Sequence, residues 1–147
     1  MIVFRMTLAE YAHSLEGIGA RRYGGRWNRK GKAVLYTSNS TALCLLEILV
    51  NVKQRYFPTY HRMVVEVPND LVNPAPPVFF TEVDRSTEYG ERWVNDGRWA
   101  AIKVASSILP SSQDAFNILI NPDHRDFAKI KLLESSPLTI DPRLLSP

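Results

Sequence analysis

The 147-residue chain has a single cysteine, Cys44, so no disulfide can form within it. A lone cysteine fits a reducing compartment, and we expect the cytoplasm. No apolar run reaches the ~18–20 residues that a membrane helix needs. The first residues also lack the basic start, apolar stretch and small-residue cleavage site of a signal peptide. The sequence therefore predicts a protein without membrane contact.

Metal-ligand spacing is also lacking. The three histidines, His13, His61 and His124, are scattered, and no cysteine pair accompanies them, so we expect no metal. The segment Gly17-Ile18-Gly19 is not a dinucleotide fingerprint, because it follows no convincing strand and no βαβ unit comes after it. Nothing in the pattern calls for a bound cofactor.

The length suits one core, and we treat residues 1–147 as a single domain. Its ten prolines favour short elements and many turns. We expect a helix opening at 7–10, a loop over 17–32, and helices at 42–52 and 84–95. We expect strands at 1–5, 33–37, 61–67, 100–107, 116–120, 127–133 and 138–140. This irregular succession predicts an α+β fold rather than βαβ winding.

A basic stretch without any acid covers residues 21–32 and includes Arg21, Arg22, Arg26, Arg29, Lys30 and Lys32, with Tyr23 and Trp27 between them. It suits phosphates or polyanions, or else forms a solvated surface loop. Within it, Gly24-Gly25-Arg26-Trp27-Asn28 combines a permissive backbone with an arginine fork for phosphate. The alternative is a glycine turn with the arginine stacked on the tryptophan.

Glu47 stands out because its segment, Leu43 to Val50, is otherwise apolar and predicts a helix buried on all sides. Its helical neighbours Leu43, Cys44, Val50 and Asn51 are not cationic, so no salt bridge within the helix is available. Such a carboxylate must find a partner elsewhere or open into a cleft. A structural ion pair, an exposed helix edge and an active-site carboxylate all remain open.

Four other residues are compatible with a structural role. Tyr36 ends a predicted strand just before the helix of Glu47 and would suit the core. Ser106 and Ser107 end an apolar strand before Pro110, where hydroxyl groups commonly cap a turn. Cys44 lies in the apolar helix, and we expect a packed thiol.

Several blocks follow one another along residues 4 to 130. They are Phe4-Arg5, Gly24-Gly25-Arg26-Trp27-Asn28-x-x-Gly31, Val34-x-Tyr36-Thr37, Leu45-Leu46-Glu47-Ile48-Leu49-Val50, Val104-x-Ser106-x-Ile108-x-Pro110 and Asn117-x-Leu119-x-Asn121-Pro122-x-His124. Together they resemble the RES-domain toxins of bacterial toxin–antitoxin systems. The resemblance implies the family's arginine, tyrosine, glutamate and serine at Arg26, Tyr36, Glu47 and Ser106. A proline commonly precedes that serine, whereas Ala105 stands here, and Ser107 is the alternative.

The resemblance also implies a fold similar to ADP-ribosyltransferase toxins, with a split β core and a few helices around an NAD-binding cleft. It implies a toxin that cleaves the nicotinamide–ribose bond of NAD, with water or phosphate as acceptor, or that transfers ADP-ribose to a protein. NAD would be the substrate and not a cofactor. The implied partner is an Xre-type helix-turn-helix antitoxin that blocks the cleft.

In this interpretation Glu47 stabilises the charge that develops on the ribose. Arg26 binds the pyrophosphate or orients Glu47, Tyr36 lies near the nicotinamide ribose, and Ser106 binds the amide or the ribose. Arg5, Trp27, Asn28 and Ser107 complete the expected substrate-binding set. The rivals are a nucleic-acid-binding module built on the basic stretch and a non-catalytic interaction domain. Glu47 and a net charge of only +3 argue against nucleic acid as a direct partner.

Overall fold

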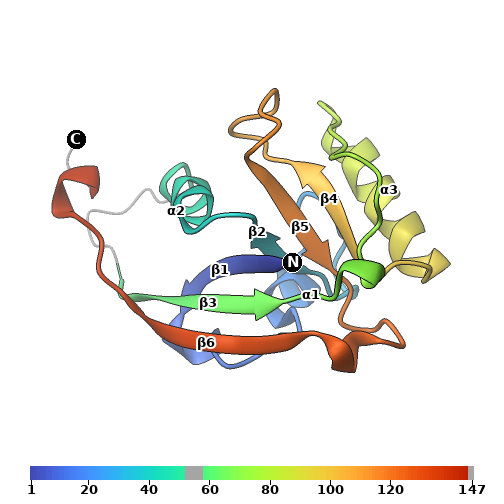
Figure 1. Ribbon diagram of the computed structural model, residues 1–147. Coiled ribbons are helices and arrows are strands. Elements are labelled where there is room, and N and C mark those ends of the chain that lie inside the picture. Colours follow the sequence, from blue (N-terminus) through green and yellow to red (C-terminus); the bar gives the residue numbers. More distant parts are fainter. Residues whose placement is uncertain (52–57, 146–147) are drawn as a thin grey trace.

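The computed structural model describes residues 1–51 and 58–145. Its centre is a six-stranded antiparallel sheet in the order β4-β5-β2-β1-β3-β6 (Figure 1). The strands are β1 (Ile2–Leu8), β2 (Leu35–Ser38), β3 (Tyr60–Glu66), β4 (Ala101–Ala105), β5 (Phe116–Ile120) and β6 (Lys131–Leu138). The helices are α1 (Ile18–Tyr23), α2 (Thr41–Leu49) and α3 (Val83–Asp96), with 3₁₀ turns at Ala9–Tyr11, Asn69–Leu71, Phe127–Lys129 and Pro142–Leu145. The predicted α+β class is confirmed.

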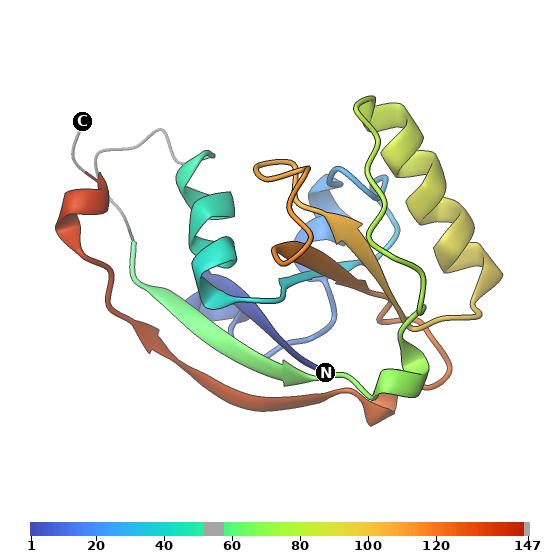
Figure 2. The same cartoon turned by 45° about the horizontal axis from the view of Figure 1, so that its top comes forward.

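The sheet is almost divided between β1 and β2. Strand β1 pairs with β3 from Ile2 to Leu8, but it pairs with β2 only where Phe4 lies opposite Ser38. Two half-sheets result, β4–β5–β2 and β1–β3–β6, which turn away from each other beside that single pair (Figure 2). This pair of half-sheets corresponds to the split β core that the family resemblance implied.

Two apolar clusters cover the central strands. The smaller cluster lies beneath α3 and contains Trp27, Val34, Trp93, Ile102, Val104 and Leu119. The larger cluster draws on both half-sheets and includes Val3, Leu35, Met63, Val65, Ile118 and Ile120. Because successive residues of a strand face opposite sides of the sheet, Leu119 packs under α3 while Ile118 and Ile120 enter the other cluster.

Helix α2 begins where Ser40 Oγ accepts a hydrogen bond from the Leu43 backbone N–H at 3.1 Å. It is not buried on all sides as the sequence predicted. Leu43 and Cys44 are buried, whereas Leu46 is 41% exposed and Val50, just beyond the helix, is 61% exposed. The prediction fails because the main packing contacts of α2 in the described residues are with β1 and β2, on one side of the helix. The predicted end of the helix, Val52, lies outside the described residues. No helix of the described ranges is long and apolar enough to cross a membrane.

Other sequence expectations need correction. The predicted loop over 17–32 contains α1, which the chain enters and leaves through the positive φ angles of Gly17 (64°) and Gly24 (75°). The helix expected to open at 7–10 is only a 3₁₀ turn, because β1 runs on to Leu8 in register with β3.

The strands predicted at 127–133 and 138–140 are instead a 3₁₀ turn followed by one strand, β6. This strand accommodates Pro137 because it lies at the edge of the sheet, where a missing N–H breaks no ladder. At the opposite edge, the segment before α3 forms isolated parallel bridges to β4 at Val72 and Val78.

The packing of α3 generates a stability prediction at Gly90. A Cβ at this buried position would lie 1.8 Å from the backbone oxygen of Trp27. We expect Gly90→Ala to lower the free energy of unfolding by about 2–3 kcal/mol, because overpacking outweighs the better helix propensity of alanine. The matched control is Gly19→Ala in α1, where a Cβ has no atom within 4 Å. Urea unfolding should show Gly19→Ala equal to or more stable than the parent; a Gly90→Ala protein as stable as the parent contradicts the close approach.

Candidate active site

Glu47 lies near the C-terminal end of α2 and is half-buried. Its Oε1 accepts hydrogen bonds from Ser106 Oγ at 2.7 Å and from Asn117 Nδ2 at 2.9 Å. The expectation that this carboxylate finds partners outside its own helix is confirmed. The partners are neutral: no salt bridge within residues 1–51 and 58–145 includes Glu47. In the same ranges Oε2 accepts no hydrogen bond, so one carboxylate oxygen is uncommitted.

The two candidate serines have different positions. Ser106, just after β4, is fully buried; its Oγ donates to Glu47 and accepts from the Ile108 backbone N–H at 3.1 Å. Ser107 is exposed to solvent. The hydroxyl of Ser106 therefore both caps the turn after β4 and holds the carboxylate.

Tyr36, on β2, has its hydroxyl fixed from two sides. It donates to Asn28 Oδ1 at 2.6 Å and accepts from the Trp27 backbone N–H at 3.0 Å. Burial raises the pKa of Tyr36 to about 12, so the phenol stays protonated. A Cβ on Gly25 would lie 2.6 Å from this hydroxyl, which explains why glycine stands there. The Tyr36 hydroxyl is thus fixed in place, and Tyr36 lines the same cavity as Glu47.

Asn28 and Trp27 make contacts within the protein that stabilise the fold. Asn28 is buried, and its Nδ2 donates to the backbone oxygens of Ala20, Arg29 and Lys32, which ties the basic stretch to α1. Trp27 is only 3% exposed and packs edge-on against Tyr89, with ring centroids 6.0 Å apart. Both residues shape the wall behind Tyr36.

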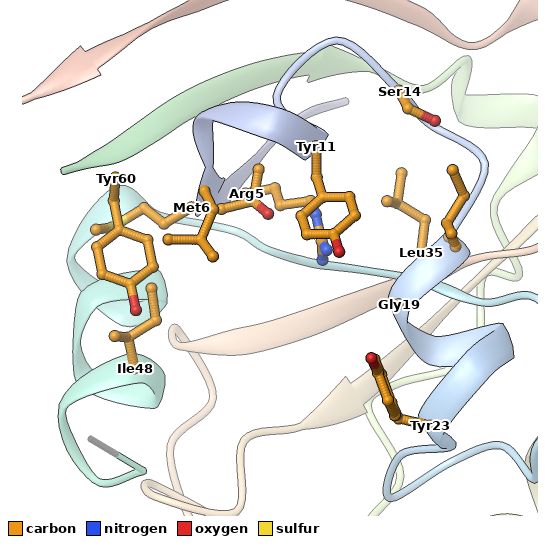
Figure 3. A pocket seen from close by; sticks show the side chains of 13 residues that line it. Arg5, Met6, Tyr11, Ser14, Gly19, Tyr23, Leu35, Ile48 and Tyr60 are labelled. Carbon is orange, nitrogen blue, oxygen red and sulfur yellow. The ribbon is translucent and has the colours of Figure 1, made fainter. Parts of the chain in front are cut away.

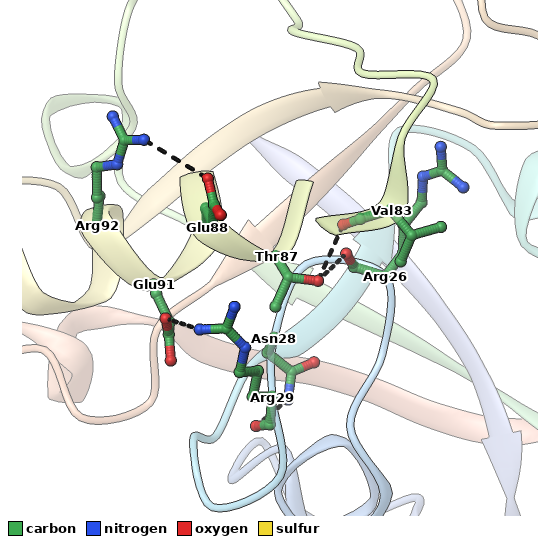
Figure 4. A network of polar contacts seen from close by, with 8 residues as sticks. All are labelled: Arg26, Asn28, Arg29, Val83, Thr87, Glu88, Glu91 and Arg92. Atoms are coloured by element: carbon green, nitrogen blue, oxygen red, sulfur yellow. Dashed lines mark hydrogen bonds and ion pairs between the residues drawn. The ribbon is translucent and has the colours of Figure 1, made fainter. Parts of the chain in front are cut away.

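Arg26 points away from Asn28 and Arg29, towards the start of α3 (Figure 4). Its Nη2 donates to the Phe80 backbone oxygen at 2.7 Å, and its guanidinium lies over the Phe79 ring at 5.6 Å. Arg26 lines neither of the two cavities around Arg5 and Glu47. Arg29 is paired with Glu91 of α3 (Figure 4). The basic stretch is therefore partly used to fasten this loop to α3.

Arg5 fills the gap that opens between β1 and β2. Its Nη1 donates to the Tyr36 backbone oxygen at 2.9 Å, where a continuous β1–β2 ladder would supply an N–H. Burial lowers the pKa of the Arg5 guanidinium, which nevertheless keeps its charge. A cation is therefore fixed in the wall of the gap, where Arg5 lines a cavity on either side; within the described residues, its one side-chain hydrogen bond is to Tyr36.

Two adjoining cavities meet at Arg5, and we call them together the cleft. The smaller, of about 150 Å³, is lined by Arg5, Tyr36, Ser38, Cys44, Glu47 and Asn117 among others. The larger, of about 290 Å³, extends between Tyr60 and Ile48 on one side and α1 on the other, with Tyr11 beside Arg5 (Figure 3). The cleft thus offers a free carboxylate oxygen, a cation and aromatic walls to one ligand.

Cys44 lines the smaller cavity as a packed thiol, as expected. Its Sγ donates to the Phe4 backbone oxygen at 3.2 Å. Burial raises the pKa of the Cys44 thiol, which keeps it protonated and unreactive at neutral pH. The described residues contain no cluster of three or more histidine, cysteine, aspartate or glutamate side chains that could hold a metal.

The sequence interpretation did not assign Ser38 or Asn117 to the site. In the structure, Ser38 Oγ donates to Asn117 Oδ1 at 2.7 Å. The available signal was an asparagine inside the apolar strand Phe116–Ile120. Tyr11 and Tyr60 carried no comparable signal, because their places at the cleft depend on tertiary packing.

Comparisons with known proteins agree with this architecture. The chain is 33% identical to the Prs ADP-ribosylating toxin of Sphingobium sp. (strain YBL2), over 91% of this chain and 88% of that protein. It is 32% identical to Toxin Res of Pseudomonas putida, over 93% and 97%. Toxin Res of Yersinia enterocolitica is 28% identical over 98% and 99%.

Among solved structures, the M. tuberculosis MbcT–MbcA toxin–antitoxin complex contains a chain with the same fold. The TM-score is 0.72 at 18% identity, and the alignment covers 98% of this chain and 86% of that one. The RES domain model matches residues 2–141. From this match over nearly its whole length, the chain belongs to the RES domain family.

Proposed function

We propose that the chain is a cytoplasmic toxin that cleaves the nicotinamide–ribose bond of NAD. The observation that carries the proposal is the Glu47 carboxylate, which lines the cleft. Its Oε1 accepts two hydrogen bonds, and its Oε2 accepts none from the residues that the structure describes. Two of the relatives reported above bear the name Toxin Res, which supports a toxic activity.

The chemistry needs little from the enzyme besides electrostatics. Nicotinamide leaves as a neutral molecule, so no strong general acid is required, and positive charge develops on the ribose as in glycoside cleavage. A carboxylate oxygen facing that charge in a partly dry cleft stabilises the transition state. We assign this role to Glu47 Oε2. Tyr36 lines the same cavity, and we assign it to contact the nicotinamide ribose.

Arg5 is assigned to the pyrophosphate. Its guanidinium is fixed by the bond to the Tyr36 oxygen, lines both cavities, and retains N–H donors in a geometry that matches phosphate. Ser106 holds Glu47 and needs no direct contact with substrate to do so. Trp27 and Asn28 support the wall through Tyr36, and Ser107 is accessible to a ligand outside the cavity.

Two activities are possible, depending on which molecule accepts the ADP-ribose after the bond is cleaved. Water or inorganic phosphate would give ADP-ribose or its phosphorylated form. The second candidate is ADP-ribosyl transfer to a protein, favoured by the relative named Prs ADP-ribosylating toxin. Incubation of the pure protein with NAD, with and without phosphate, followed by product identification, distinguishes hydrolysis from phosphorolysis. Incubation of the protein with labelled NAD and cell extract reveals transfer of ADP-ribose to a protein. The proposal is overturned if NAD stays intact and no protein is labelled in any of these reactions.

The nucleic-acid-binding alternative fits the structure poorly. It needs aromatic faces open to bases along the basic stretch, as in single-strand binders. Tyr23 is 68% exposed, but Trp27 is buried at 3%, and Arg29 is engaged by Glu91. The basic stretch therefore offers only part of such a surface.

We propose that an Xre-type helix-turn-helix antitoxin restrains this activity by blocking the cleft. The similar fold in the MbcT–MbcA toxin–antitoxin complex supports a protein partner of this kind. The exposed arginines Arg21 and Arg22 of α1 lie near the larger cavity, where an acidic or carboxylate-ended segment would be attracted.

Glu47→Gln should abolish NAD turnover while the fold survives. Glutamine keeps the shape of glutamate but lacks the charge, so we expect kcat to fall by about 100-fold or more, the loss typical of removing one transition-state stabiliser. The matched control is Glu134→Gln on the outer strand β6, a glutamate that also accepts from a serine hydroxyl. Full activity in a well-folded Glu47→Gln protein excludes Glu47 as the catalytic residue.

Arg26→Lys tests whether Arg26 contributes to the activity. Lysine keeps the charge but loses the planar fork that bonds the Phe80 oxygen. Because Arg26 lines neither cavity, the effect would pass through the neighbouring Trp27 and Asn28, which hold the Tyr36 hydroxyl. We expect kcat/KM to fall by at least about tenfold, which corresponds to ~1.4 kcal/mol. Arg92→Lys, on the exposed side of α3, serves as the control. Unchanged kinetics would remove Arg26 from the substrate-binding set.

The purified toxin–antitoxin complex should be inactive, and the free toxin active. We expect hydrogen exchange to slow over residues 21–36 and at the cleft end of α2 when the antitoxin binds. Binding should weaken as salt rises, because exposed charges are screened. Protection confined to residues 84–99, in a complex that still consumes NAD, would show that restraint works from another surface.

A further inference from the structure

A line of directed hydrogen bonds runs from β2 to the Glu47 carboxylate. Ser38 and Asn117 lie directly opposite each other on the antiparallel strands β2 and β5. Ser38 Oγ donates to Asn117 Oδ1 at 2.7 Å, and Asn117 Nδ2 donates to Glu47 Oε1 at 2.9 Å. The line therefore ends on the oxygen that Ser106 also binds.

The chemistry of the groups fixes the direction of this line. An ionised carboxylate only accepts hydrogen bonds, so the Asn117 amide must turn its NH₂ group towards Glu47. Its carbonyl oxygen then faces Ser38 and can only accept, so the Ser38 hydroxyl must donate. If the Ser38 hydroxyl were absent, the amide would lose one of the two bonds that hold this orientation.

We propose that Asn117, oriented by Ser38, is a positioning residue that fixes the Glu47 carboxylate with Oε2 open to the cleft. The inference rests on the proposed function for its kinetic consequence, but not for the geometry. Glutamate has several rotatable bonds, and an unheld side chain spends much of its time in unproductive rotamers. Two donors on Oε1, one following β4 and one from β5, remove that freedom before substrate arrives.

Asn117 is poorly explained as a residue of the strand alone. Strand β5 is otherwise apolar, with Ile118, Leu119 and Ile120 fully buried. The ladder with β2 uses backbone groups and does not need a side-chain amide. The amide instead makes its two bonds at the cleft, and Asn117 lines the same cavity as Glu47.

The kinetic experiment compares Asn117→Ala, Ser38→Ala and the double variant with the parent. We expect Asn117→Ala to lower kcat for NAD cleavage at least tenfold while KM changes less than threefold. Ser38→Ala should lower kcat by a smaller factor, and Ser38→Thr, which keeps the hydroxyl, should restore it. Because Ser38 acts through Asn117, the double variant should be no slower than Asn117→Ala. The matched control is Ser136→Ala, which removes a serine that donates to Glu134 on β6.

A purely structural role predicts a different pattern. The melting temperature would then fall in each variant, kcat per folded molecule would stay constant, and the effects of Ser38→Ala and Asn117→Ala would add. That pattern overturns the proposal. A KM rise with unchanged kcat also overturns it, since Asn117 would then be a binding residue.

Crystal structures of Ser38→Ala and Asn117→Ala provide a readout that does not depend on activity. We expect the Asn117 amide to shift or to become less ordered in Ser38→Ala, and the Glu47 carboxylate to move or to occupy several rotamers in Asn117→Ala. A Glu47 carboxylate that stays in place in Asn117→Ala overturns the positioning role. If the parent does not cleave NAD, the proposed function fails, and these structures alone still decide whether Asn117 positions Glu47.

Discussion

The near-division of the sheet between β1 and β2 is the constraint on which the cleft depends. Because the two strands share only the Phe4–Ser38 pair, their backbones do not form a ladder with each other beyond it, although β1 still pairs with β3 and β2 with β5. Arg5 supplies one of the missing donors through its bond to the Tyr36 oxygen. An uninterrupted sheet would close this gap with backbone, whereas here a guanidinium fills it and leaves room for a ligand.

The same division explains how Glu47 is held. Its helix, α2, packs against β1 and β2, while the side chains that bind its carboxylate come from β5 and from the turn after β4. The carboxylate therefore links elements that the apolar core joins only indirectly. Its geometry depends on the relative placement of the half-sheets, and a small shift between them would alter the direction of Oε2.

The sequence showed that Glu47 needs partners outside its own helix, but not which residues supply them. The lack of cations around Glu47 in its own helix correctly predicted that its partners come from elsewhere. It could not identify Ser106 and Asn117, which lie 59 and 70 residues away and meet Glu47 only through sheet topology. Strand and helix types were readable from periodicity in the longer elements. They were not readable where glycines at 17 and 24 bracket the short helix α1, nor at the 3₁₀ turns Ala9–Tyr11 and Phe127–Lys129. The burial of Trp27 was also hidden, because it depends on the close approach of α3 at Gly90.

The two outer strands of the sheet differ in how they would meet a second copy of the chain. The free side of β4 is covered by the segment that bridges it at Val72 and Val78. The outer side of β6 is open, but Pro137 removes one backbone donor, and a register shift between Val64 and Val65 of β3 makes the β3–β6 pair irregular. Such an edge is a poor template for adding strands from another molecule. Neither edge therefore offers an uninterrupted row of backbone donors and acceptors to a second copy of the sheet.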